Sequence, residues 1–263
     1  NINYWYSFFK YFKIKVHSDK TEYGLETIVK QISLEKLNGI SFVSQRSNID
    51  PQKGLFYAYY PVDIFFSWGL DSVKKIKNKV LNKENPKINS IVISGCQHIK
   101  EISKNEQLIF RDIKNRLQRN GAKTIVLFLD SNHMLNESYK GQTFDTRILE
   151  KIYFSLLSLV IDNKSFGLIL KPKKMSFFTY FYDKYANLFF KAEKTGRLYI
   201  ERDFQFRIPS NYARISDLVL GIGSDDIPAS ILECAILNKP AVIFDYVGLS
   251  VEFYSWAKNK VIF

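Results

Sequence analysis

The sequence predicts an α/β protein built from two parallel-sheet domains, and two observations support this. Short apolar runs typical of buried strands alternate along the 263 residues with longer segments in which apolar residues recur every three or four positions. Polar or glycine-containing clusters directly follow many of the short runs, where open parallel sheets bind their ligands. This alternation predicts helices on both faces of each sheet.

The individual elements can be placed in order along the chain. Segments predicted to be strands are 13–17, 40–44, 63–67, 90–94, 124–129, 167–170, 198–200, 218–220 and 241–244. Segments predicted to be helices are 4–12, 21–34, 70–80, 106–119, 146–160, 176–194 and 227–237. The polar stretch 81–89 is the expected linker between an amino-terminal domain, 1–80, and a carboxy-terminal domain, 90–263. The chain starts without methionine and ends in a strand-like run, so we expect a fragment at both ends, in which the amino-terminal domain is truncated.

The segment 216–245 reads as strand, glycine turn, helix and strand. The apolar run 218–220 suits a strand buried on both faces. After it, Gly221 and Gly223 would allow the backbone to turn sharply and to approach a ligand closely. Ser224, together with the aspartate that follows it, is expected to cap the next helix. The alternative is an ordinary crossover between two strands.

The helix 227–237 would direct its amide N–H groups and positive dipole end toward the turn, which favours a phosphate. Ser230 lies in its first turn, where the hydroxyl can reach a phosphate oxygen. Glu233 lies three residues further on the same face and could accept hydrogen bonds from a ribose. We therefore predict that a nucleotide binds here.

Other polar residues follow predicted strands in both domains. In the first domain these are Gln45, Arg46, Ser67 and Trp68, which we assign to an acceptor-side cleft. In the second they are Gly95, Asp130, Lys171 and Lys173, of which Gly95, Lys171 and Lys173 are assigned to donor binding. Lys171 is preset by the proline after it, which favours contact with a diphosphate. Arg46 is either a phosphate or carboxylate clamp or a surface ion-pair partner, and Trp68 either stacks on a base or sugar or packs in the core. Their recurrence predicts a cleft between two facing domains.

Composition narrows the class of protein. The net charge of +12 favours anionic ligands. The lysine clusters lack the alternating aromatic and basic pattern of an RNA-binding sheet, so nucleic acid is not expected as a partner. The three histidines and two cysteines have no metal-ligand spacing, so no metal is expected. Since no membrane-spanning run or secretory leader is present in the sequence, we expect a cytoplasmic protein, with contact at the inner face of the membrane as one role for its positive charge.

The segment 216–245 resembles the donor-binding region of GT-B glycosyltransferases, in which a glycine- and serine-bearing turn precedes a glutamate-bearing helix and a proline step leads into the next strand. It is also similar to the CDP-glycerol glycerophosphotransferases, although GIGSDD stands where paired serines after aspartate-tyrosine are typical of that group. The phrases 13–17, 38–47 and 66–69 look like bacterial surface-carbohydrate transferases of the GT-B type, associated with lipopolysaccharide, O-antigen or capsule assembly.

This resemblance implies two Rossmann-like domains and a donor site for a nucleotide-activated sugar at Gly221, Gly223, Ser224, Ser230 and Glu233. It implies metal-independent transfer of the sugar to a surface polysaccharide or lipid-linked acceptor that faces the first domain. The nucleotide sugar is a co-substrate, and no other cofactor is expected. A general base must deprotonate the acceptor hydroxyl, and His17 or Asp19 at the end of the first strand are the candidates.

Four alternatives are weighed against this function. A CDP-polyol phosphotransferase or a sugar-nucleotide 2-epimerase would share the architecture, and the epimerase would turn over its donor without an acceptor. A glycan-binding module would bind glycans without nucleotide affinity. A redox dinucleotide enzyme would need GxGxxG after an early strand, and GIGSDD supplies only the first two glycines.

Overall fold

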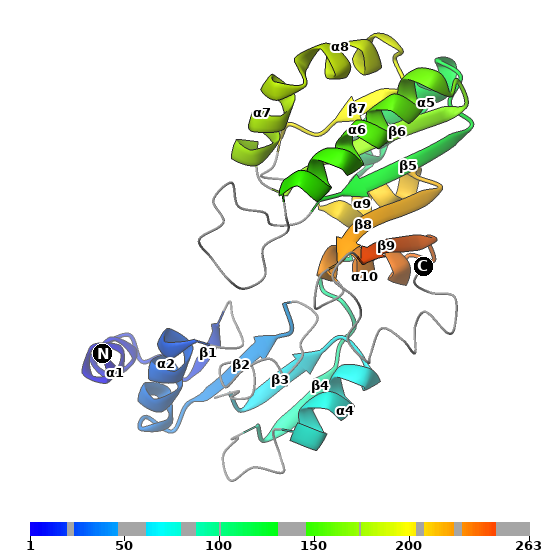
Figure 1. Ribbon diagram of the computed structural model, residues 1–263. Coiled ribbons are helices and arrows are strands. Elements are labelled where there is room, and N and C mark those ends of the chain that lie inside the picture. Colours follow the sequence, from blue (N-terminus) through cyan, green and yellow to red (C-terminus); the bar gives the residue numbers. More distant parts are fainter. Residues whose placement is uncertain are drawn as a thin grey trace. The chain divides into compact units, whose positions relative to one another are not determined.

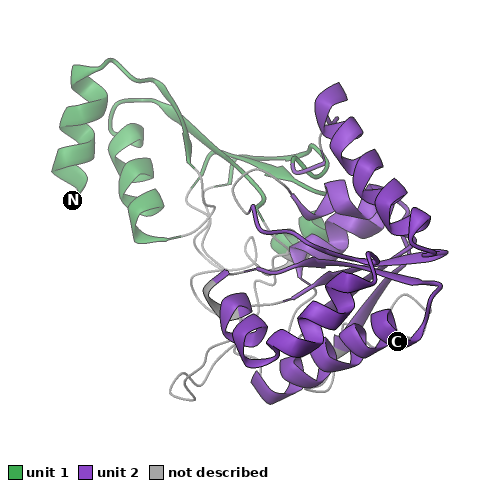
Figure 2. Cartoon of the chain, turned by 90° about the horizontal axis from the view of Figure 1, so that it is seen from above, with its two compact units in different colours: residues 1–97 green, residues 98–263 purple. Residues whose placement is uncertain are grey.

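The computed structural model describes residues 1–19, 24–46, 62–79, 88–99, 101–130, 146–173, 175–203, 208–223 and 228–245. The chain divides into two compact units, unit 1 at Asn1–Gln97 and unit 2 at His98–Phe263 (Figures 1 and 2). Each unit contains one sheet in which every described pair of neighbouring strands is parallel. The predicted α/β class with two Rossmann-like domains is therefore confirmed.

Unit 1 contains a four-stranded sheet of order β1-β2-β3-β4. Its elements are α1 (Ile2–Tyr11), β1 (Val16–Asp19), α2 (Leu25–Glu35), β2 (Ile40–Ser44), β3 (Ile64–Ser67), α4 (Leu70–Lys79) and β4 (Ser90–Ile93). Val43 and Phe65 from adjacent strands pack with Ile76 of α4 in a small core. At the amino end of the sheet, the Asp63 carboxylate accepts hydrogen bonds from the backbone and hydroxyl of Ser41 and from Asn89, which ties β2 and β4 to the start of β3.

The division between the units lies later than the sequence indicated. Strand β4 pairs with β3 from Ile64↔Ser90 to Ser67↔Ile93, and so belongs to unit 1. We predicted a linker at 81–89 and a second domain from residue 90, whereas the boundary between the compact units falls after Gln97. The prediction used the polar composition of 81–89, of which residues 81–87 lie outside the described part. Backbone pairing decides where a strand belongs, and composition does not report it.

Unit 2 contains a five-stranded sheet of order β7-β6-β5-β8-β9. Its elements are α5 (Lys104–Arg119), β5 (Thr124–Leu129), α6 (Thr146–Asp162), β6 (Phe166–Lys171), α7 (Met175–Lys184), α8 (Ala186–Lys194), β7 (Leu198–Ile200), α9 (Pro209–Ile215), β8 (Leu218–Gly223), α10 (Ala229–Ile236) and β9 (Ala241–Asp245). The chain steps outward from the central β5 to β6 and β7, then returns to the other side of β5 with β8 and β9. This order creates a topological switch point between β5 and β8.

Helices cover both faces of this sheet, as the uninterrupted burial of β5 requires (Figure 1). Side chains alternate along the strand, so Ile125 and Leu127 face one layer while Val126 and Phe128 face the other. The first layer consists of α5, α9 and α10, and the second of α6, α7 and α8. The sheet is thus held between two apolar cores, and its strand ends remain as the place for polar chemistry.

Local signals explain where several helices begin and end. Helix α5 starts before the predicted residue 106 because Ser103 and Glu106 form a capping box. The single helix predicted over 176–194 is two helices, α7 and α8, which meet at Tyr185. This break allows Phe189 of α8 to pack against Phe178 of α7, with ring centroids 5.5 Å apart. Helix α9 was not predicted.

Candidate functional site

The candidate site lies at the carboxyl ends of the central strands of unit 2. In the strand register, Leu129 of β5 pairs with Lys171 of β6 on one side and with Gly221 of β8 on the other. The residues that follow these positions therefore emerge together at one edge of the sheet. This edge includes the switch point between β5 and β8, where doubly wound sheets bind ligands.

Gly221 lies inside strand β8 and not in a turn. The strand continues to Gly223, and its residues from Val219 to Gly223 pair with β9. The absence of a side chain at Gly221 serves close packing of the following helix. A Cβ built there would lie 2.3 Å from Cδ1 of Ile231 in α10. We expected a sharp turn at this glycine, and the structure instead uses it to bring α10 against the strand. Gly223 is the last residue of β8, opposite Asp245.

Helix α10 presents its amino end to the same edge and begins at Ala229. Ser230 lies in its first turn and is half-buried. Glu233 lies one turn further on and is only 7% exposed. Among the described residues, no group forms a hydrogen bond with its buried Oε2 atom. Ser224, the expected cap and phosphate contact, lies outside the described residues.

Glu233 and Lys171 form an electrostatic pair at the site. Burial raises the pKa of the Glu233 carboxyl to about 7, although the positive charge of Lys171 opposes this rise. Burial likewise lowers the pKa of Lys171, and the charges of Glu201, Asp130 and Glu233 oppose that change. The half-buried Lys171 thus interacts electrostatically with three carboxyl groups, each from a different strand end or helix. Glu201, which follows β7, accepts hydrogen bonds from the Tyr199 hydroxyl and from a backbone N–H.

Asp130 follows β5 directly and is 7% exposed. One carboxylate oxygen, Oδ2, accepts a hydrogen bond of 3.0 Å from the Tyr153 hydroxyl of α6. The other, Oδ1, accepts one from the backbone N–H of Lys173. Burial raises the pKa of Asp130 to about 7, against the opposing effects of these two hydrogen bonds and of the positive charges of Lys171 and Lys173. The Lys173 side chain itself is exposed.

In unit 1 the structure brings together three of the four residues predicted for an acceptor-side cleft. Gln45 is 1% exposed, and its side-chain oxygen accepts hydrogen bonds from the Ser67 hydroxyl at 3.2 Å and the Trp68 backbone N–H at 2.8 Å. Its amide nitrogen donates to Ser72 at the start of α4. These bonds join the carboxyl ends of β2 and β3 to α4. Arg46, the fourth residue, is exposed.

Gly95 lies in unit 1, two residues after the end of β4, and not in the sheet of the donor residues with which it was grouped. Its φ of +77° lies in the left-handed region that favours glycine. The grouping followed from the predicted boundary at residue 90. The conformational requirement explains the glycine without a ligand.

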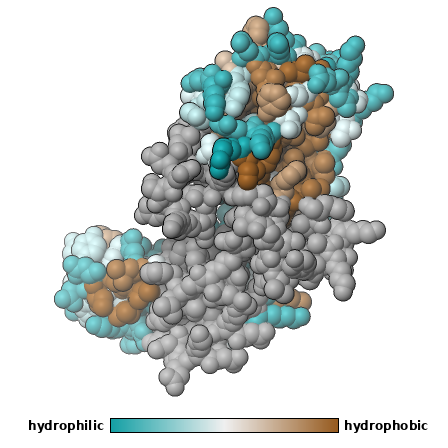
Figure 3. All heavy atoms as spheres, in the orientation of Figure 1, coloured by the Kyte–Doolittle hydropathy of each residue, from teal (hydrophilic) through white to brown (hydrophobic). Residues whose placement is uncertain are grey.

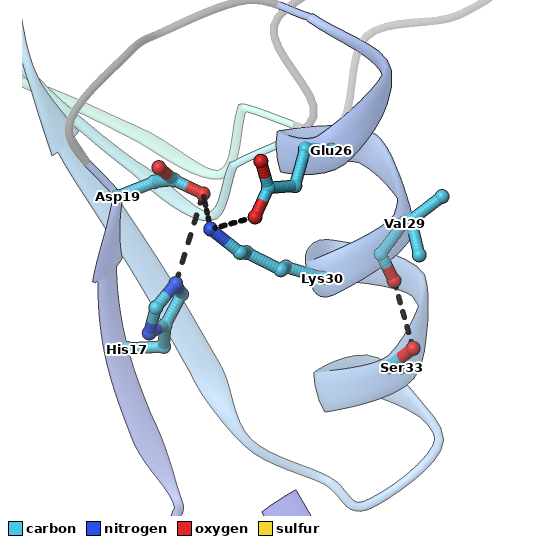
Figure 4. A network of polar contacts seen from close by, with 6 residues as sticks. All are labelled: His17, Asp19, Glu26, Val29, Lys30 and Ser33. Carbon is cyan, nitrogen blue, oxygen red and sulfur yellow. Dashed lines mark hydrogen bonds and ion pairs between the residues drawn. The ribbon is translucent and has the colours of Figure 1, made fainter. Parts of the chain in front are cut away.

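His17 and Asp19, the candidate bases, lie on one side of β1, facing α2 (Figure 4). The Nε2 atom of His17 is 3.7 Å from Oδ2 of Asp19, and Lys30 Nζ of α2 is 3.3 Å from the same oxygen. Lys30 also pairs with Glu26 at 3.0 Å. Burial lowers the pKa of His17, with the nearby Asp19 charge acting in the opposite direction. The two candidates are therefore neighbours, and a lysine balances the charge of the aspartate.

Among the described residues, no group of three or more His, Cys, Asp or Glu side chains is arranged to hold a metal ion. Cys96 and Cys234 are both free thiols. Within the same part of the chain, no helix combines the length and apolar character needed to cross a membrane.

No protein-family model matches the chain, and no curated protein matches it. Solved structures with a similar fold include S. aureus MnaA with UDP, at a TM-score of 0.58 and 12% identity, covering 100% of this chain and 64% of that one. The comparison with solved structures also returned a glycosyltransferase from Rickettsia africae ESF-5, at a TM-score of 0.45 and 10% identity, covering 95% of this chain and 62% of that one. The present chain thus spans less than two thirds of each. The similarity to MnaA shows that the two proteins share a fold.

Two residues of the site were missed in the sequence. Glu201 follows β7 directly, so the rule that selected the other strand-end residues would have found it. Tyr153 lies in the middle of α6 among apolar neighbours and is 1% exposed. No local pattern separates its hydroxyl from an ordinary core tyrosine, because its partner Asp130 is 23 residues away.

Proposed function

We propose that this chain is part of a metal-independent GT-B glycosyltransferase. In this proposal, unit 2 binds a nucleotide-activated sugar, and the sugar is transferred to a hydroxyl of a surface polysaccharide or lipid-linked acceptor. The fold and the polar groups at the switch point of unit 2 support the donor half of the proposal. The surface-carbohydrate role rests on the resemblance of the segments 13–17, 38–47 and 66–69 to transferases of that kind.

The observation that carries the proposal is the unpartnered Oε2 atom of Glu233. A buried polar group without a hydrogen bond costs free energy, and no described residue donates to this oxygen, so a ligand hydroxyl that donates to it would stabilise the site. The hydroxyls of a ribose are such donors, and a carboxylate is the usual group that binds them in doubly wound sheets. Lys171 and the amino end of α10 then face the diphosphate, where they would stabilise the negative charge of the leaving group.

Calorimetry with UDP, CDP, CMP, GDP and NAD tests the donor site. Glu233→Gln should weaken binding of the preferred nucleotide by about tenfold or more, because a ligand hydroxyl then loses a charged acceptor. The matched control is Glu101→Gln, which changes an exposed carboxylate of the same unit. Equal affinity in the wild type and Glu233→Gln, or binding of NAD alone, would contradict the proposal.

A second candidate is a sugar-nucleotide 2-epimerase, because the same donor site serves an enzyme that needs no acceptor. The fold similarity to a protein solved with UDP favours a uridine nucleotide for either enzyme. Incubation with UDP-sugars in the absence of acceptor distinguishes the two. Conversion of the donor to its epimer would favour the isomerase, while slow hydrolysis or no change would favour the transferase. Glycan binding without nucleotide affinity would leave a glycan-binding module.

The acceptor side of the proposal is unit 1. His17 is the candidate general base, since burial keeps its imidazole neutral at pH 7 and neutral imidazole accepts protons. The Asp19 carboxylate, 3.7 Å from Nε2, would stabilise the imidazolium that forms when His17 takes up a proton. The buried hydrogen bonds of Gln45, Ser67 and Trp68 are satisfied within the unit, so we assign these three residues to the support of the acceptor surface.

An anionic membrane surface is the proposed partner of helix α1. Tyr4, Tyr11 and Phe12 are 59%, 80% and 58% exposed, and Lys10 and Lys13 are exposed beside them. Hydrophobic and hydrophilic atoms adjoin on this part of unit 1 (Figure 3). Exposed aromatic rings with neighbouring lysines suit the headgroup region of a membrane containing acidic lipids. Such contact would bring the enzyme to a lipid-linked acceptor.

A further inference from the structure

Asp130 occupies a central position in the candidate donor site. It follows β5, the middle strand of the sheet, at the switch point with β8. Its two carboxylate oxygens are bound by different elements, Oδ2 by the Tyr153 hydroxyl of α6 and Oδ1 by the Lys173 backbone N–H after β6. Tyr153 is itself fixed among the rings of Phe128, Phe178 and Phe181. The carboxyl group therefore links a rigid core residue to the segment that carries the site's lysines.

Charged and polar groups from two elements act on Asp130. Lys171 and Lys173 act on it from the end of β6, and the Tyr153 hydroxyl from α6. Through Lys171 it is connected to Glu201 after β7 and to Glu233 on α10. Three carboxylates thus share the field of one half-buried lysine. A diphosphate placed beside Lys171 would add negative charge close to these three carboxyl groups.

We propose that Asp130 is a positioning residue of the donor site, which holds the Lys171–Lys173 segment in place and takes up a proton when a nucleotide diphosphate binds. The inference rests on the function proposed above. In its ionised form, the carboxylate competes with the ligand phosphates for the two lysines. In its neutral form, Oδ1 still accepts the Lys173 N–H, and the acid proton can be donated to the Tyr153 oxygen. Protonation therefore removes the competing charge and keeps the segment fixed.

The test measures binding of UDP-glucose by calorimetry between pH 5.5 and 8.5, because its diphosphate diester does not titrate in that range. Relative to the affinity of Asp130→Asn, wild-type affinity should fall by about tenfold from pH 6.5 to 8, with uptake of a proton on binding. The ratio of the two affinities removes the effect of Glu233, which also titrates in this range. Asp130→Asn imitates the neutral acid and should bind with less pH dependence than the wild type. Asp130→Ala removes both hydrogen bonds, so this variant should bind UDP-glucose weakly at every pH. Tighter binding by Asp130→Asn than by Asp130→Ala would show that the hydrogen bonds position the site even when the negative charge is absent.

A second measurement does not depend on any variant. The carboxyl ¹³C signal of Asp130 in the wild-type protein should titrate at higher pH when UDP-glucose is bound than when it is absent. Binding without a change in this titration would overturn the inference and leave the proposed function standing. If the affinity of Asp130→Asn for UDP-glucose changed with pH as much as that of the wild type, the inference would likewise be overturned and the proposed function would stand. Absence of binding by the wild type of UDP-glucose and of every other nucleotide in the panel above, at every pH, would contradict both.

Discussion

The indole Nε1 of Trp68 donates a hydrogen bond of 2.7 Å to the backbone carbonyl of Gln45, and the side-chain oxygen of Gln45 accepts one of 2.8 Å from the Trp68 backbone N–H. Each residue thus binds the other through one main-chain and one side-chain group. The two residues follow neighbouring parallel strands, β2 and β3. The two hydrogen bonds join the carboxyl ends of β2 and β3 in unit 1.

Replacement of Gln45 by leucine should destabilise unit 1. It would leave the Ser67 hydroxyl and the Trp68 N–H without their acceptor in a buried site, at a cost of about 2–4 kcal/mol. Chemical denaturation followed by tryptophan fluorescence measures the change. Lys74→Ala, at an exposed position of α4, is the control and should change stability by less than about 0.5 kcal/mol. Equal stability of the two variants would contradict this account.

Gly221 and Ile231 should be energetically coupled. A methyl group at Gly221 would overlap Ile231, so Gly221→Ala should cost about 1–3 kcal/mol. Ile231→Ala removes a buried side chain and should cost about 2–5 kcal/mol. In the double variant the new methyl enters the space that isoleucine leaves, so its cost should be smaller than the sum. Strict additivity in a double-mutant cycle would contradict the packing role.

Asp130 should make the stability of the ligand-free protein fall with rising pH. Its pKa in the folded state, about 7, lies above the ordinary value of 3.8, so the folded protein binds more protons than the unfolded chain between these values. Stability from this group is fully present below pH 3.8 and is lost as the pH rises toward 7. Asp130→Asn should reduce this loss by on the order of 2 kcal/mol between pH 5 and 8. Thermal unfolding across that range measures it, and parallel curves for both proteins would argue against it.

His17→Asn should lower the turnover number of sugar transfer by about a hundredfold or more, since loss of a general base has this magnitude. Nucleotide affinity should be unchanged, because the proposed donor site lies in unit 2. Burial lowers the pKa of His17 from 6.5, so wild-type activity should decline only below that pH. The control His98→Asn should retain activity. A variant of His17 that keeps full turnover would move the base to another residue.

Replacement of Tyr4 and Tyr11 by serine should weaken binding to vesicles that contain phosphatidylglycerol. Both rings are exposed on α1, and their loss removes apolar area that enters the headgroup region. Binding should also decline with salt and be weak on phosphatidylcholine alone. Phe190→Ser, which changes an exposed ring of unit 2, is the control. Equal sedimentation of all three proteins with the vesicles would contradict a role for α1.

The strands were largely predictable because burial on both faces leaves uninterrupted apolar runs. The predicted bounds of β2, β5 and β7 agree with the structure residue for residue. Where prediction failed, the missing information was tertiary. The break at Tyr185 depends on rings that meet across two helices, and the place of β4 depends on its pairing with β3.

The candidate site was predictable in part for the same reason. Strand-end rules selected Lys171, and helix spacing selected Glu233, which the structure brings to one sheet edge. The rules also selected Gln45 and Ser67, whose hydrogen bonds turn out to join strands to each other. A polar residue after a strand looks the same in the sequence whether its partner is a ligand or a neighbouring turn. The partners of Gln45 and Ser67 are known only from the hydrogen bonds in the structure.

Strand β5 joins two halves of the unit 2 sheet that come from separate stretches of chain, β6–β7 before the return and β8–β9 after it. A nucleotide that contacts Lys171 and Glu233 together would bridge these halves as a non-covalent crosslink. At a hundredfold excess over its Kd such a ligand adds about 2.7 kcal/mol to stability. Amide hydrogen exchange in β6 and β9 should therefore slow together when the nucleotide binds, because opening either half of the sheet then requires loss of the contacts with the ligand.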